Sequence, residues 1–147
     1  MSSPNPYSFA VKVRHPFRDA KEIADRLCLV ATHSNVAGQP RVTPTGQPLD
    51  GVYAETYCCF YVNVPEQQQL DESLCKANAF LAKDRLFVRR LRNEGARFVY
   101  SVSFQPGYSA HQLEPETLAA MAKLGVELAL SVYEVRQLRG RRVENFL

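Results

Sequence analysis

The sequence predicts an α+β fold, a two-layer sandwich in which a mainly antiparallel sheet carries its helices on one face. The main observation is a repeated order of elements. A strand-like segment, a short helix and an apolar stretch follow one another over 7–30, and the same order recurs over 97–135. Because one strand-helix-strand unit cannot bury its own apolar face, we expect two ferredoxin-like halves to share one sheet.

The first elements follow from local patterns near the N-terminus. Residues 1–6, rich in Ser and Pro, are expected to form a flexible tail. Apolar residues alternate with polar ones over 8–14, which predicts a half-buried strand. Asp19, with Glu22 three residues later, is typical of a capping box and predicts a helix that reaches about Val30.

The middle of the chain is predicted to hold a long loop, a strand and two helices. Pro and Gly recur every few residues over 33–51, which indicates a loop with short edge strands near 41–43. Aromatic and β-branched residues over 52–64 predict a strand. The helical segment 71–94 would place Asp84 on its apolar face. We therefore expect a break, with Asp84 capping a second helix.

The C-terminal elements repeat the first pattern. A strand is predicted over 97–105, and Pro115 suits the first turn of the helix that follows. Gly125 ends that helix, and clean alternation over 126–135 predicts the last strand. Residues 136–147 contain four arginines and are expected to form a basic tail.

The composition of the chain indicates its cellular compartment and excludes some classes of binding partner. The 147 residues suit a single domain over 1–147, with 46% hydrophobic and 22% charged residues. A net charge of +3 is too small to favour nucleic acid. No apolar run approaches the roughly 20 residues of a membrane span, and the N-terminus lacks the pattern of a secretory signal. We expect a cytoplasmic protein that binds neither nucleic acid nor membrane.

No motif identifies a metal, a cofactor or a catalytic residue. The four cysteines, Cys28, Cys58, Cys59 and Cys75, have no CxxC spacing, so a zinc site or a redox pair is not supported and free thiols are expected. A nucleophile elbow, a phosphate-binding glycine loop and HExxH are all lacking from the sequence. The sequence therefore assigns no catalytic residue, no metal ligand and no cofactor.

Polar residues in and beside the loop 33–51 keep open the alternative of a small enzyme. His33, Arg41, Asp50 and Glu55 are the candidates, since paired carboxylates with a neighbouring base can support hydrolysis. Their spacing matches no motif with a known mechanism.

Two histidines precede the two repeated helices. If the halves are related by a pseudo-twofold axis, His15 and His111 would be neighbours and could hold a metal or an anion. The alternative is that both are solvent-exposed loop histidines.

Arg85, Arg89 and Arg92 share one flank of a predicted helix, at positions i, i+4 and i+7. Such charges usually form a solvated face. The alternative is a docking strip for an acidic protein partner or for nucleic acid.

Tyr53, Tyr57 and Tyr61 are expected to alternate onto one face of their strand. Helices can cover only one face of the sheet, and exposed edges and apolar faces are often covered by symmetric pairing. We therefore predict a homodimer through these tyrosines. A ligand groove or a stacking platform is the alternative.

The order of elements resembles a bacterial domain-of-unknown-function family with duplicated strand-helix-strand halves. The resemblance covers most of 8–135 and rests on Glu22-Ile23 through Leu27, the loop around Pro44-Thr45-Gly46 and the segment Gly125–Tyr133. Some members resemble immunity proteins of bacterial toxin systems. This implies a non-enzymatic protein-binding module of toxin-immunity-like type. The alternatives are the small enzyme and a self-associating structural domain.

Overall fold

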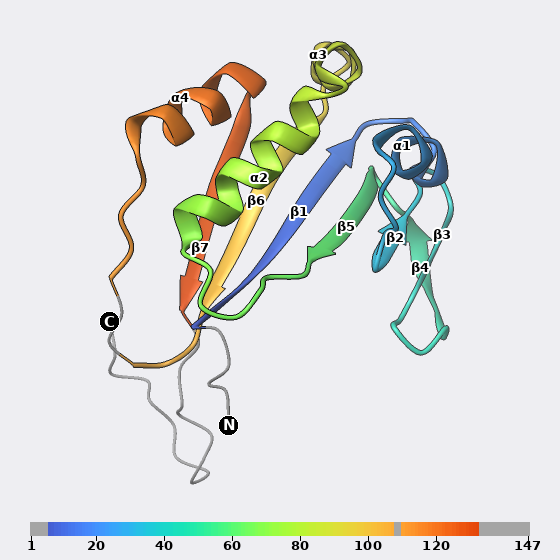
Figure 1. Ribbon diagram of the computed structural model, residues 1–147. Coiled ribbons are helices and arrows are strands. Elements are labelled where there is room, and N and C mark those ends of the chain that lie inside the picture. The colour runs from blue at the N-terminus through green and yellow to red at the C-terminus, as the bar shows by residue number, and fades with distance from the viewer. Residues whose placement is uncertain (1–5, 108–109, 133–147) are drawn as a thin grey trace, which may run out of the picture.

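The computed structural model describes residues 6–107 and 110–132. In this part of the chain a five-stranded sheet, a two-stranded hairpin and four helices are found (Figure 1). In chain order the elements are β1 (Tyr7–His15), α1 (Ala20–Leu27), β2 (His33–Asn35), β3 (Pro40–Val42), β4 (Pro48–Val52), β5 (Thr56–Val62), α2 (Leu70–Ala82), α3 (Arg85–Asn93), β6 (Arg97–Phe104), α4 (Pro115–Leu124) and β7 (Val126–Val132).

The main sheet has the strand order β2-β5-β1-β6-β7. β1 is its central strand and pairs antiparallel with both β5 and β6. β2 is antiparallel to β5, whereas β7 is parallel to β6 and is reached through α4. A mixed fold of helices with a mainly antiparallel sheet is therefore confirmed.

The ferredoxin-like duplication is not confirmed by the strand pairing. β1 and β2, which flank α1, are not direct neighbours, because β5 lies between them and pairs antiparallel with both. β6 and β7, which flank α4, run parallel. A repeated helix pattern carries no information about which strands become neighbours: β6 and β7 pair directly, whereas β5 is inserted between β1 and β2. The chain between α1 and β5 also holds β2, β3 and β4, which gives it room to turn back.

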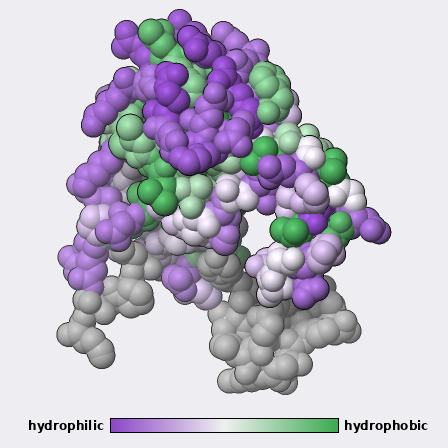
Figure 2. Space-filling view, turned by 90° about the vertical axis from the view of Figure 1, so that its right-hand side faces the viewer, coloured by the Kyte–Doolittle hydropathy of each residue, from purple (hydrophilic) through white to green (hydrophobic). Residues whose placement is uncertain are grey.

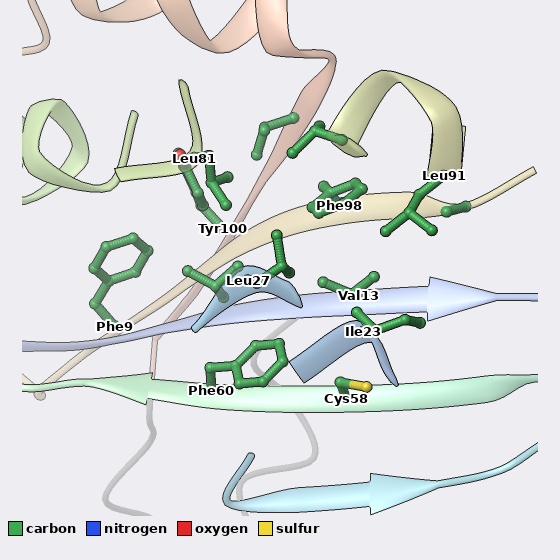
Figure 3. Close-up of a cluster of buried hydrophobic side chains, with 14 of the residues drawn as sticks. Phe9, Val13, Ile23, Leu27, Cys58, Phe60, Leu81, Leu91, Phe98 and Tyr100 are labelled. Carbon is green, nitrogen blue, oxygen red and sulfur yellow. The ribbon is translucent and has the colours of Figure 1, made fainter. Parts of the chain in front are cut away.

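The core forms on one face of the sheet because inward residues alternate along the strands. Figure 3 shows Phe9, Val13, Phe60, Phe98 and Tyr100 directed from β1, β5 and β6 towards helical residues such as Leu27, Leu81 and Leu91. All of these side chains are buried in one cluster. The hydrophobic effect of this shared cluster holds the helices on the sheet.

The first helix begins as the sequence predicts. The Asp19 carboxylate accepts hydrogen bonds from the backbone N–H groups of Lys21 and Glu22, at 3.1 and 3.4 Å. Cys28 ends the helix in the left-handed region, at a φ of 57°. Asp19 as the N-cap is therefore confirmed.

The break in the helical segment 71–94 is also confirmed, but its mechanism differs from the prediction. Asp84 lies between α2 and α3, and its side chain makes no capping hydrogen bond. Its carboxylate lies 3.6 Å from the Arg26 guanidinium instead. The ion pair to α1 replaces the predicted cap.

The segment predicted as a long loop over 33–51 contains β2, β3 and most of β4. Figure 2 shows the side of the molecule that carries α1 and this hairpin, where hydrophobic residues form separate patches among hydrophilic ones. Within the described ranges no helix is long and apolar enough to cross a membrane. The basic tail 136–147 and most of the N-terminal tail lie outside the described residues.

Candidate functional site

A groove of about 380 Å³ lies among α2, α3 and α4. α2 and α4 pack beside each other, and α3 continues from the end of α2 (Figure 1). We call this cavity the helix groove. Its small and apolar lining residues are Ala79, Ala82, Val88, Ala120 and Leu124, and its charged ones are Arg85, Arg89, Arg92, Lys123 and Glu116.

The three arginines predicted to share a flank all line the helix groove. Helical spacing places Arg85, Arg89 and Arg92 on one side of α3, while Phe87 and Leu91 enter the core. All three arginine side chains are exposed. Within 6–107 and 110–132, none of them makes a hydrogen bond or an ion pair. The groove therefore holds a cluster of positive charge in which none of the three arginines pairs with a described carboxylate.

This cluster contrasts with the other arginines of the described chain. Four of them have carboxylate partners: Arg14 with Glu55, Arg18 with Glu22 and Glu94, Arg26 with Asp84, and Arg97 with Glu127. Inside the groove four cations, the three arginines and Lys123, face one carboxylate, Glu116. The local charge balance therefore favours an anionic occupant.

The position of the Arg92 side chain also explains why residue 125 is a glycine. Gly125 ends α4 with a φ of 79°, a conformation that other residues rarely adopt. A Cβ atom at this position would overlap the Arg92 guanidinium. The cation therefore lies at the carboxyl end of α4, where the helix dipole is negative.

Polar contacts fix the first turn of α4 on α2, at the other end of the groove. Buried Asn78 accepts a hydrogen bond from the Tyr100 hydroxyl at 2.9 Å and donates one to the Thr117 carbonyl at 3.2 Å. Asp71 accepts a hydrogen bond from the backbone N–H of Glu114 at 2.8 Å, and this bond lowers the pKa of its carboxyl. No sequence pattern had pointed to Asn78 or Asp71. The available signal was the spacing of Asn78, which lies four residues after Leu74 and three before Leu81 on the apolar face of the predicted helix.

The three tyrosines do not share one strand face, so this part of the prediction is wrong. β5 begins at Thr56, and Tyr53 precedes it, with its hydroxyl 3.2 Å from the backbone N–H of Val42 in the hairpin. Tyr57 and Tyr61 do lie together on the face of β5 opposite the core. The turn after β4 breaks the alternation that the sequence suggested.

The two remaining tyrosines differ in exposure. Tyr61 is 60% exposed, and its ring centroid lies 6.2 Å from that of His33. Tyr57 lies under the Arg14 guanidinium, 4.7 Å from the ring centroid. Burial and a hydrogen bond with Cys59 raise the pKa of Tyr57 to about 12.

The polar candidates of the 33–51 region are not brought together into one site. Arg41 donates to the Asp50 carbonyl oxygen at 3.3 Å within the hairpin, which leaves the Asp50 carboxylate uninvolved. Glu55 pairs with Arg14 at 3.1 Å, and His33 contacts Tyr61. In the described part of the chain no three His, Cys, Asp or Glu residues could hold a metal ion.

His15 and His111 are not neighbours, which corrects the proposed pair. The ring of His111 lies 5.9 Å from that of Tyr7, at the start of the nine-residue β1. His15 ends that strand, ~26 Å away at ~3.3 Å per residue. His15 is also fully buried rather than exposed. Its Nδ1 accepts hydrogen bonds from two backbone N–H groups, and its Nε2 donates to Glu94 at 2.8 Å.

Comparison with protein-family models, with curated proteins and with solved structures finds no match for this chain. The resemblance to the family with immunity-like members therefore stays a prediction.

Proposed function

We propose that this protein is a non-enzymatic binding module whose helix groove receives an acidic segment of a partner protein. One observation carries the proposal: Arg85, Arg89 and Arg92 line the groove, are exposed and have no partner in the described residues. Arginines in this arrangement can each form charge-assisted hydrogen bonds with a carboxylate.

The lining of the groove suits an amphipathic helix. Ala79, Ala82 and Ala120 have short side chains, so a partner helix can approach closely and bury its apolar face. Acidic residues at i, i+4 and i+7 of that helix would match the spacing of the three arginines. Nucleic acid is less well matched, because the described lining contains no aromatic residue on which a base could stack.

The toxin-immunity-like type is a narrower form of this proposal, and it rests on the family resemblance. This role would place the protein in a bacterial cytoplasm, and the four free cysteine thiols fit the reducing conditions of that compartment. An adjacent toxin gene whose product forms a stable complex with this protein would support the immunity role. No detectable complex at micromolar concentrations would count heavily against it.

A designed peptide tests the binding module directly. The probe is a fluorescent helical peptide with Glu at i, i+4 and i+7 and with Ala and Leu on its adjoining face. Fluorescence anisotropy should detect binding that weakens as salt is added. The combined variant R85Q/R89Q/R92Q should bind about tenfold more weakly, because exposed ion pairs contribute about 0.5 kcal/mol each.

Arg90 provides the matched control. It lies on the same helix and is exposed, but it does not line the groove. Arg90→Gln should leave the affinity unchanged. Equal binding of the triple variant and the wild type would contradict the proposal. Tighter binding of a single-stranded oligonucleotide than of the peptide would favour nucleic acid instead.

A homodimer is the second proposal, and the exposed Tyr61 favours it. We infer that the four helices lie on the core face of the sheet, which leaves Tyr61 exposed on the opposite face beside the half-buried Tyr57. Size-exclusion chromatography with light scattering should then give a dimer mass, and Tyr61→Ser should shift it towards the monomer. A monomer mass for the wild type at high micromolar concentration would reject this proposal.

A further inference from the structure

A second cavity, of about 340 Å³, is lined by residues from the start of α2 and the end of β7. Its walls come from α2, β6, β7 and the segment that leads into α4. The lining is mostly apolar and includes Leu70, Phe104, Leu113, Leu128 and Leu130, together with His111. Its volume lies in the range of pockets that take small molecules.

His111 is the unusual member of this lining. Both of its ring nitrogens are buried, and neither has a hydrogen-bond partner among residues 6–107 and 110–132. Buried polar atoms in proteins are nearly always hydrogen-bonded, so an imidazole left in this state requires an explanation.

The aromatic neighbours of His111 pack against its ring but do not provide hydrogen bonds to its two nitrogens. Phe104 lies 4.8 Å away and Tyr7 5.9 Å away, between ring centroids. The Tyr7 hydroxyl is already engaged, at 2.7 Å from Ser73 Oγ and 2.9 Å from the Gln68 carbonyl oxygen. Neither nitrogen is exposed to the cavity as the ring stands, so a molecule there pairs with this unused hydrogen-bonding capacity when the imidazole turns towards it.

We propose that this cavity binds a small neutral alcohol or phenol, whose hydroxyl pairs with His111 and whose apolar body meets the leucines. A neutral imidazole has one donor and one acceptor nitrogen, and a hydroxyl can pair with either. The described lining residues include no Lys, Arg, Asp or Glu. A carboxylate ligand would thus be buried without a fixed counter-charge, which is unfavourable.

The test compares three probes of similar shape: 4-ethylphenol, its methyl isostere 4-ethyltoluene, and 4-ethylbenzoate. Titrations followed by NMR report on the His111 ring nitrogens and the Leu128 and Leu130 methyl groups. The phenol should bind about three- to tenfold more tightly than the isostere, as one neutral hydrogen bond provides. It should also shift the His111 ring nitrogens.

A pair of variants assigns this preference to His111. His111→Phe should bind the phenol and the isostere equally. His33→Phe makes the same change on an exposed strand outside the cavity, and it should retain the preference. Equal binding of the two probes by the wild type, tighter binding of the benzoate, or no shift at His111 would each overturn the proposal. These wild-type results stand even where His111→Phe fails to fold.

Discussion

Arg18 and Glu94 form a two-point ion pair that joins the segment after β1 to the end of α3. Arg18 Nε lies 2.6 Å from Glu94 Oε1, and Arg18 Nη2 lies 2.7 Å from Oε2. His15 donates to the same carboxylate at 2.8 Å. Two segments far apart in the sequence are thus fixed to each other by one acidic side chain.

The stability of Glu94→Gln should fall less steeply than that of the wild type as the pH drops from 4.5 to 2. The Arg18 hydrogen bonds, helped by His15, lower the pKa of Glu94 from 4.5 to about 2. A folded-state pKa below the unfolded value stabilises the fold above about pH 4.5, and this contribution is lost as the pH falls towards 2. Glu94→Gln should therefore have a lower urea midpoint at pH 7, and the difference should narrow between pH 4.5 and pH 2.

The exposed Glu66 offers a control for this experiment. Glu66→Gln should keep the wild-type midpoint at pH 7. A midpoint difference for Glu94→Gln that stays constant over the acid range would show that the pair does not act through ionisation of Glu94.

Asp84→Ala should lower the free energy of unfolding by less than the removal of a helix cap would. Its carboxylate makes no capping hydrogen bond, and it pairs with Arg26 at 3.6 Å where both side chains are partly exposed. Such pairs contribute about 0–1 kcal/mol. Urea unfolding of Asp84→Ala, Arg26→Ala and the double variant should give a coupling free energy within that range. A loss near 2 kcal/mol for Asp84→Ala alone would indicate capping in solution.

Tyr100→Phe should be clearly destabilising although it removes one oxygen atom. Tyr100 is fully buried, and its hydroxyl donates to Asn78 Oδ1, which would lose this hydrogen bond. An unsatisfied buried acceptor costs about 1–3 kcal/mol in unfolding free energy, measured with urea. Tyr61→Phe makes the same change at an exposed position and should stay within about 0.5 kcal/mol of the wild type. Equal values for the two variants would contradict this account of Asn78.

The four cysteines should fall into two groups that differ in their rate of reaction with a thiol reagent. Cys28 and Cys75 are exposed, whereas Cys58 and Cys59 are buried. Burial raises the pKa of the Cys58 thiol to about 11, so little of the reactive thiolate forms at pH 8. A thiol reagent at pH 8 should therefore label Cys28 and Cys75 in the folded protein, and all four cysteines in denaturant. Labelling of Cys58 as fast as Cys28 would contradict the buried placement.

Local signals in the sequence predicted the elements well. Asp19 and Gly125 mark real helix ends, because capping depends on residues only a few positions apart. The break at Asp84 was also predictable, since it follows from one polar side chain on an apolar helical face. Pairing between distant segments was not predictable in this way. The direction of β5 relative to β1 depends on the whole path of the intervening chain.

For the candidate site too, local spacing was predictable and the packing of distant segments was not. Helical spacing was sufficient to group Arg85, Arg89 and Arg92, but the groove itself exists only because α4 packs beside α2 and α3. The sequence singled out His111 by its place before a repeated helix, but that pattern paired it wrongly with His15. Its significance comes from its place between Tyr7 and Phe104, which only the packed structure provides.

The central position of β1 affects how the chain folds while it is being synthesised. β1 is made before β5 and β6, yet Phe9 pairs with Val62 on one side and with Val102 on the other. The strand therefore leaves the ribosome with both edges open, and its apolar face is uncovered until those later segments follow. Closing such long loops slows folding. During this interval the nascent chain exposes β1 to chaperones and to aggregation, until β5 and β6 cover its edges.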